Sequence, residues 1–170
     1  MNKTKTLAII YVYLQIFCVA FVLGTASHLP SVVASHFDAS GQSDATMAKE
    51  QYIGIFLAIM VFIPSSLAFL PRVIAKLPHH LINLPNRAYW LASERFGETQ
   101  KILQVYFLFL SCLLICFMAF IYGLMVLANQ QNPPSISGIY LAISSGVFVV
   151  LTLYWAYKLN AQFSHIPDAD

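Results

Sequence analysis

The side chains best suited to chemistry lie in one polar segment near the start of the chain. They are His28, His36, Asp38 and Asp44. Imidazole and carboxylate groups together suit zinc and similar ions, yet this spacing matches no standard zinc signature, and neither HExxH nor CxxC occurs. We therefore expect no metal and no cofactor, and we expect His36 and Asp38 to hydrogen-bond loop backbone and hold a turn.

Other reactive side chains form no catalytic arrangement in the sequence. Glu94 and Glu98 are one helical turn apart, as an acid–base pair would be, but neighbouring Arg95 and Lys101 indicate a solvated, charge-balanced helix start. The three cysteines fall in apolar stretches, where a thiol is usually a small apolar filler; they are Cys18, Cys112 and Cys116. No nucleophile with a base and an orienting group is visible, so we do not expect an enzyme.

The elements that must position these groups are membrane-spanning helices. Apolar residues make up 59% of the 170 residues and charged residues only 9%, whereas a soluble domain carries about 25% charged residues. Four stretches lack Asp, Glu, Lys, Arg and His and approach or exceed the roughly 20 residues needed to cross a bilayer: 7–24, 52–70, 102–128 and 139–157. Strands are excluded because no stretch alternates as a barrel strand does. The prediction is one all-α domain over residues 1–170, an integral membrane four-helix bundle.

Two of these stretches carry further signals. Pro64 lies inside the second and is expected to kink it, with Ser65 and Ser66 bonding the backbone groups that the proline frees. The first follows Lys3 and Lys5, as a signal peptide would, but its 18 apolar residues exceed an h-region of about 7 to 15. We therefore expect the first stretch to be retained as a span.

Basic residues predict the orientation of the helices. Eight of the nine Lys and Arg residues fall on one side if both termini are cytoplasmic, and Lys49 alone falls on the other. Because short cytoplasmic loops are rich in Lys and Arg, the prediction is N-in and C-in. The net charge of +2 gives no reason to expect nucleic acid as a partner.

The outer loop after the first helix is predicted to be ordered. Asp38 to Gly41 is typical of a turn, because Asp bonds backbone two residues on and Gly accepts positive φ. Asp44 is expected to cap the second helix at its N-terminus. Apolar side chains are expected to fold the loop onto the outer mouth of the bundle; they are Leu29, Val32, Val33 and Phe37.

The connection between the second and third helices, from Pro71 to Lys101, forms a cytoplasmic interfacial segment. Prolines divide it, so it is not one continuous helix, and a short helix is expected from about Ser93 into the third span. Tyr89 and Trp90 suit the bilayer interface. The candidate interface residues of this segment are Asn86, Arg87, Tyr89, Trp90, Glu94 and Arg95.

Two strings resemble a bacterial membrane family, a conserved domain of unknown function also found at the N-terminus of Sdp-type (sporulation-delaying protein) immunity proteins. The first string has Leu29-Pro30, Val33-x-x-His36-Phe37-Asp38-Ala39-Ser40-Gly41, Asp44 and Lys49; the second has Leu84-Pro85-Asn86-Arg87-x-Tyr89-Trp90-Leu91 and Glu94-Arg95. The resemblance implies a bacterial cytoplasmic (inner) membrane, and relatives that recognise a toxic peptide and can recruit a repressor. This chain departs from those immunity proteins in having four predicted spans.

The function expected is non-enzymatic recognition of a ligand or partner through the outer loop, in an immunity- or sensor-like protein. Candidate recognition residues are His28, Pro30, His36, Phe37, Asp38, Gly41, Asp44 and Lys49. The expected partners are membrane lipid and a peptide or another membrane protein. The alternatives are an accessory subunit of a membrane enzyme and a transporter-like protein, although a transport pathway normally has ionisable groups within the spans, and the predicted spans have none.

Overall fold

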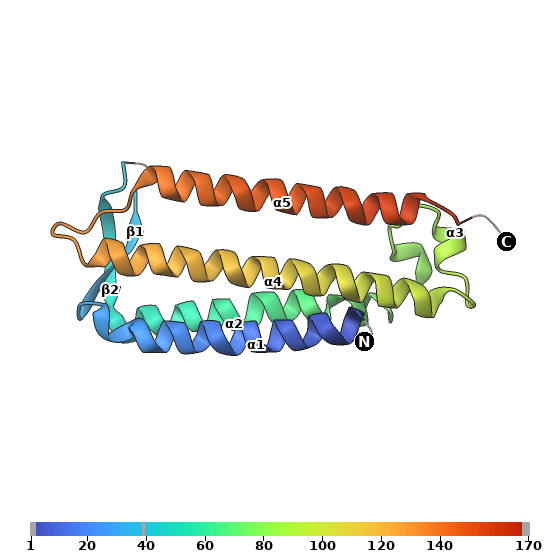
Figure 1. Cartoon of the computed structure of the whole chain (residues 1–170), viewed down its shortest axis with the longest axis horizontal. Coiled ribbons are helices and arrows are strands. Elements are labelled where there is room, and N and C mark those ends of the chain that lie inside the picture. Colours follow the sequence, from blue (N-terminus) through green and yellow to red (C-terminus); the bar gives the residue numbers. More distant parts are fainter. Residues whose placement is uncertain (1–2, 39, 168–170) are drawn as a thin grey trace.

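The computed structural model describes residues 3–38 and 40–167. Long helices dominate it, and a pair of strands follows the first long helix and precedes the second in the sequence (Figure 1). The elements are α1 Lys3–Thr25, η1 Ala26–His28, β1 Val32–Phe37, β2 Ser43–Ala48, α2 Lys49–Ile74, η2 His79–Leu81, α3 Arg87–Trp90, α4 Phe96–Asn129 and α5 Gly138–Ser164. Helices α1, α2, α4 and α5 are long and apolar enough to cross a membrane. This confirms the four predicted spans and extends each of them at both ends.

The molecule has two chemically distinct ends. The strands and the α4–α5 turn lie at one end, which we call the hairpin end (Figure 1). The start of α1, the α2–α4 connection and the end of α5 lie at the other, which we call the basic end. Eight of the nine Lys and Arg residues belong to the segments at the basic end, and Lys49, at the start of α2, belongs to the hairpin end.

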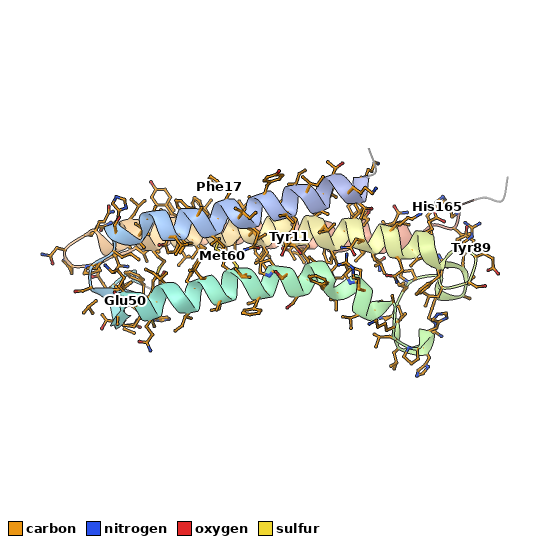
Figure 2. All side chains as sticks on the ribbon, turned by 90° about the horizontal axis from the view of Figure 1, so that it is seen from below. Tyr11, Phe17, Glu50, Met60, Tyr89 and His165 are labelled. Atoms are coloured by element: carbon orange, nitrogen blue, oxygen red, sulfur yellow. The ribbon has the colours of Figure 1, made fainter. Side chains whose placement is uncertain are left out.

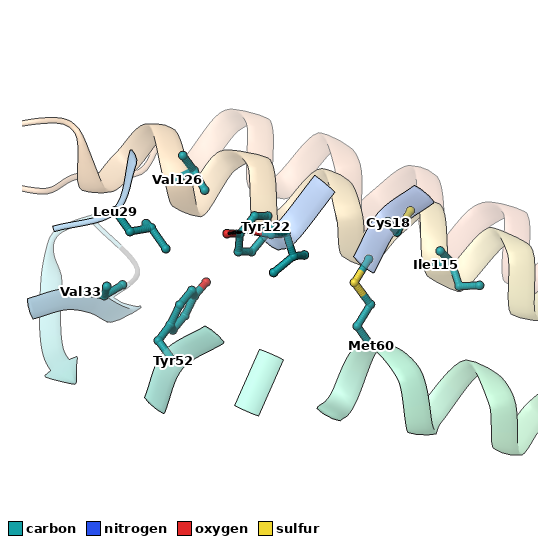
Figure 3. Packing of buried hydrophobic residues seen from close by; sticks show 9 residues of the cluster. Cys18, Leu29, Val33, Tyr52, Met60, Ile115, Tyr122 and Val126 are labelled. Atoms are coloured by element: carbon teal, nitrogen blue, oxygen red, sulfur yellow. Dashed lines mark hydrogen bonds between the residues drawn. The ribbon is translucent and has the colours of Figure 1, made fainter. Parts of the chain in front are cut away.

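Helix α4 is the centre of the bundle. Helices α1 and α2 pack against it and against each other, and α5 runs along another side of α4 (Figures 1 and 2). Cys18, Met60, Ile115 and Tyr122 are buried where α1, α2 and α4 meet (Figure 3). Helix α5 buries Phe163 near its C-terminal end and leaves most of its apolar side chains exposed. Such exposure is what a lipid-facing helix requires, because lipid tails are as apolar as the side chains.

Helix α2 passes through Pro64 and Pro71 without interruption. Pro64 has no N–H and therefore leaves the carbonyl of Met60 without its helical donor. The side-chain amide of Gln15 on α1 donates a hydrogen bond to this carbonyl, at 3.2 Å. The expectation for the neighbouring serines was wrong: Ser65 hydrogen-bonds the Tyr11 hydroxyl at 2.8 Å, and Ser66 bonds the carbonyl of Phe62. The donor to the Met60 carbonyl therefore comes from α1, a helix distant in the sequence, and not from the serines next to Pro64.

The exclusion of strands was wrong for the loop after α1. Strands β1 and β2 form an antiparallel hairpin in which Val33 pairs with Met47 and Phe37 with Ser43. Asp44 consequently lies in β2 and does not cap α2, which begins at Lys49 after Ala48. Neither strand alternates strictly between buried and exposed residues, and the register shifts between Ala34 and His36 and again between His36 and Phe37.

The α2–α4 connection folds back onto the end of α5. The indole N–H of Trp90 donates to the carbonyl of Phe163 at 2.9 Å, and the two rings meet edge to face. Trp90 is 1% exposed, so its ring packs inside the protein, and its position at the level of the bilayer interface stays a prediction. Helix α4 begins at Phe96, a few residues after Ser93.

Candidate functional site

The hairpin is attached to the bundle through the last residue of α4. The Asn129 side-chain oxygen accepts the Ala34 N–H at 2.7 Å, and its NH2 group donates to the Ala34 carbonyl at 3.1 Å. The same NH2 group also donates to the Met125 carbonyl within α4 at 2.9 Å. Both Asn129 and Ala34 are buried. One amide thus behaves as an added strand residue for β1 and fixes the hairpin to α4.

A second attachment joins the hairpin turn to the α4–α5 connection. The N–H of Ile136 donates to the Gly41 carbonyl at 2.9 Å, and Gln42 forms a β-bridge with Ser135. Gly41 has φ +83, and a Cβ there would collide with the Ile136 carbonyl oxygen. Glycine is therefore required both for the left-handed backbone and for the close approach.

The turn between the strands is organised by Asp38, as predicted. Its carboxylate accepts the Ser40 hydroxyl at 2.6 Å, the Ser40 N–H at 2.8 Å and the Gln42 N–H at 3.0 Å. These donors, the Ser40 hydroxyl first, hold the pKa of the Asp38 carboxyl below its usual value because they stabilise its charged form. Asp38 is therefore a structural residue of the turn.

His36 and Asp44 form an exposed pair across the two strands. His36 Nδ1 and Asp44 Oδ1 lie 2.6 Å apart, and the side chains are 69% and 46% exposed. Since a carboxylate can only accept, Nδ1–H is the donor, and Nε2 is left without a partner among the described residues. The expectation that His36 bonds loop backbone was wrong. The pair presents an oriented imidazole and a carboxylate at the hairpin surface.

The remaining predicted recognition residues are dispersed around this pair. His28 and Pro30 are exposed, Phe37 is half-buried, and Lys49 is half-buried with its N–H bonded to the Ser31 carbonyl at 3.0 Å. His28 borders a cleft of about 480 Å³ between α1 and α4, lined by Thr25, Phe120 and Gln130 among others. The cleft is lined mainly by apolar side chains of α1 and α4, with Thr25, His28 and Gln130 as its polar members.

The floor beneath the hairpin is aromatic, and the sequence did not indicate it. The rings of Tyr52 and Phe56 on α2 and Tyr122 on α4 lie within 5.0 to 6.5 Å of one another, centroid to centroid. The Tyr122 hydroxyl donates to the carbonyl of Val22 at 3.1 Å. Leu29 and Val33 of the hairpin segment are buried in the same cluster (Figure 3). The expected folding of the loop onto the bundle is confirmed for these two residues, whereas Val32 is 59% exposed.

The candidate interface residues at the basic end mostly support structure. Asn86, at φ +50, donates from its side chain to the carbonyls of Phe163 and Ser164 at 3.1 and 2.9 Å. With Trp90 it therefore caps α5. Arg87 donates to the His80 carbonyl at 3.3 Å. The guanidinium of Arg95 lies over the Tyr89 ring and 3.7 Å from Glu98, and the Ser93 hydroxyl holds the pKa of the Glu94 carboxyl below its usual value.

Among residues 3–38 and 40–167, no group of three or more His, Cys, Asp and Glu side chains is placed to hold a metal ion. Sequence reasoning missed Asn129 and Ile136, which attach the hairpin, because the uncharged α4–α5 turn carried no motif. Comparison with protein-family models, with curated proteins and with solved structures found no match.

Proposed function

We propose that this chain is a non-enzymatic, immunity- or sensor-like protein of a bacterial inner membrane that binds a peptide or a membrane partner through its hairpin. One observation carries the proposal. The exposed His36–Asp44 pair stands on a hairpin that is bonded to the bundle both at β1, by Asn129, and at the turn, by Ile136. A surface held in place before binding loses little conformational freedom when a partner arrives.

The free edge of β2 favours an extended peptide as the ligand. The hairpin has two strands, and Asp44, Ala45 and Thr46 of β2 are consecutively exposed. An exposed strand edge offers backbone donors and acceptors to which an extended peptide can add as a further strand. In such a complex the His36–Asp44 pair would supply side-chain selectivity beside the backbone hydrogen bonds.

The orientation is part of the proposal, with the hairpin outside the cytoplasm and both termini inside. The concentration of Lys and Arg at the basic end supports it. A reporter active only outside the cytoplasm, fused after Asn132 in the α4–α5 connection, is expected to be active. The same reporter fused after Ser93 is expected to be silent, and the reversed pattern would place the hairpin in the cytoplasm and overturn the proposal.

Site-specific photocrosslinking in cells tests the recognition itself. A crosslinking amino acid at exposed Thr46 is expected to yield a discrete adduct, which His36→Ala/Asp44→Ala should abolish. The matched control is His80→Ala/Glu94→Ala, which removes an exposed histidine and an exposed acid at the basic end and should leave the adduct unchanged. Amide exchange at Ala34 reports whether the hairpin stays docked; an exposed pair of this kind contributes at most about 1 kcal/mol, so docking should persist.

The adduct also separates the proposal from its alternatives. A small peptide or a membrane regulator as the crosslinked species supports recognition, whereas a stable enzyme complex supports the role of an accessory subunit. An adduct that survives the His36→Ala/Asp44→Ala change, or the absence of any adduct at Thr46, contradicts recognition by this surface.

A further inference from the structure

A groove at the basic end runs between α1 and α5, with α4 as its floor. It consists of two adjoining clefts of about 500 and 230 Å³, which share Val105 and Tyr106 of α4. The first cleft is lined by residues near the starts of α1 and α4 and near the end of α5, and the second is lined by residues farther along the same three helices. The groove therefore extends from the end of the bundle into its membrane-spanning part.

The two halves of the groove differ in chemistry. Lys3, Lys101 and Gln162 line the half at the end of the bundle. Leu7, Phe109 and Trp155 line the deeper half, and Lys158 stands at its border. A ligand that fits both halves must combine a polar or anionic head with an apolar chain.

The lysines of the groove have no acidic partner in the part of the chain that the structure describes. Lys3, Lys101 and Lys158 are exposed and take part in no salt bridge there, and no Asp or Glu lines either cleft. Arg95, by contrast, is paired with Glu98. Three uncompensated positive charges around one groove attract an anion, and the long lysine stems let the ammonium groups reach the headgroup level.

The floor of the groove is held in place by hydrogen bonds between α4 and α5. The indole N–H of Trp155 donates to the Tyr106 carbonyl at 2.8 Å, and the Tyr106 hydroxyl donates to the Lys158 carbonyl at 3.2 Å. These bonds fix the separation of the two helices at the point where the polar half meets the apolar half. The groove is thus a built feature of the basic end.

We propose that this groove binds an anionic phospholipid, with its phosphate near Lys3, Lys101 and Lys158 and an acyl chain along Leu7, Phe109 and Trp155. Basic pockets between membrane helices select anionic headgroups through charge, and the apolar half supplies the contact that a soluble anion lacks. The proposal is independent of recognition at the hairpin end, because it uses different residues at the opposite end of the bundle.

Trp155 provides a local probe of the bound lipid. The protein is reconstituted in phosphatidylcholine vesicles containing a minor fraction of phosphatidylglycerol, with bromine atoms, which quench tryptophan fluorescence, on the acyl chains of one lipid at a time. Brominated phosphatidylglycerol is expected to quench the wild type more strongly than brominated phosphatidylcholine at equal content. Trp155→Phe should remove this excess, because the remaining Trp90 is 1% exposed and lines neither cleft.

The charge requirement is tested by Lys3→Gln/Lys101→Gln/Lys158→Gln, which should lower the preference for phosphatidylglycerol by about fivefold for each lysine. The matched control, Lys49→Gln/Arg72→Gln/Lys76→Gln, removes the same charge outside the groove and should keep the preference. Equal quenching by both lipids in the wild type, an excess that persists in Trp155→Phe, or equal loss in both triple variants would overturn the proposal. Glycerol 3-phosphate should not compete; displacement by it would indicate a phosphate site without a lipid requirement.

Discussion

Gln15 of α1 donates its side-chain N–H to the carbonyl oxygen of Met60 on α2, the carbonyl that Pro64 deprives of its helical donor. The contact lies in the middle of the bundle, where Met60 is fully buried. A hydrogen bond that satisfies such a backbone group between membrane helices contributes about 1 kcal/mol. Pro64 and Gln15 therefore form a matched pair across two helices.

This relationship predicts a thermodynamic coupling between Gln15 and Pro64. Gln15→Leu should lower the free energy of unfolding by about 1 kcal/mol, within the range of hydrogen bonds between membrane helices. In a Pro64→Ala background the backbone N–H of residue 64 can donate to the Met60 carbonyl. Gln15→Leu should then lower the free energy of unfolding by clearly less than it does in the wild type. Unfolding in mixed micelles measures all four proteins, and additive costs would show that the hydrogen bond does not compensate for the proline.

Asn129→Leu is expected to release the hairpin from α4. The change removes both partners of Ala34 and leaves its buried N–H unsatisfied, at a cost of about 1–3 kcal/mol. Amide exchange at Val33 and Ala34 should accelerate, while exchange in the middle of α1 and α2 stays unchanged. Asn132→Ala, a change of an exposed residue in the following turn, is the control; equal exchange rates in both variants would contradict an anchoring role for Asn129.

The cap of α5 predicts a non-additive pair of substitutions. Asn86 and Trp90 both donate to the Phe163 carbonyl, so each single change, Asn86→Ala or Trp90→Phe, leaves it with one donor. The double variant leaves this carbonyl without either donor. Its free energy of unfolding should fall by about 1 kcal/mol more than the sum of the losses in the two single variants. Tyr89→Phe is the control, because the Tyr89 hydroxyl is buried without a hydrogen-bond partner. Protease cleavage after Lys158 reports the fraying of α5.

The Asp38 turn predicts a pH dependence of the hairpin. The folded-state pKa of Asp38 is lowered, so its stabilisation is present above the unfolded pKa of about 3.9 and is lost as the pH falls through the folded value. The NMR shifts of the Ser40 and Gln42 amide protons should titrate together below pH of about 3.9. Asp38→Asn keeps an acceptor oxygen and should abolish the titration; a midpoint above the ordinary value in the wild type would contradict the turn geometry.

Composition and hydropathy were sufficient to predict the four long helices. Stretches without charge and long enough to span a bilayer have few alternatives to the helix, because only a helix satisfies all of its backbone groups internally. The turn at Asp38 and Gly41 was equally predictable, since side-chain bonding and positive φ are local properties. These features depend on neighbours in sequence.

Other features depend on residues far apart in sequence. They are the attachment of the hairpin to α4 and the hydrogen bond from Gln15 to the carbonyl that Pro64 leaves without a donor. Ala34 and Asn129 are separated by 95 positions, and Gln15 and Met60 by 45. Asp44 has the chemistry of a helix cap, but β1 and the imidazole of His36 compete for the same segment, and the hairpin prevails. Local pattern thus determined which segments become membrane helices. Only the packing of those helices decided that Gln15 bonds the Met60 carbonyl and that Asn129 bonds Ala34, because each of these contacts joins two elements that are distant in the sequence.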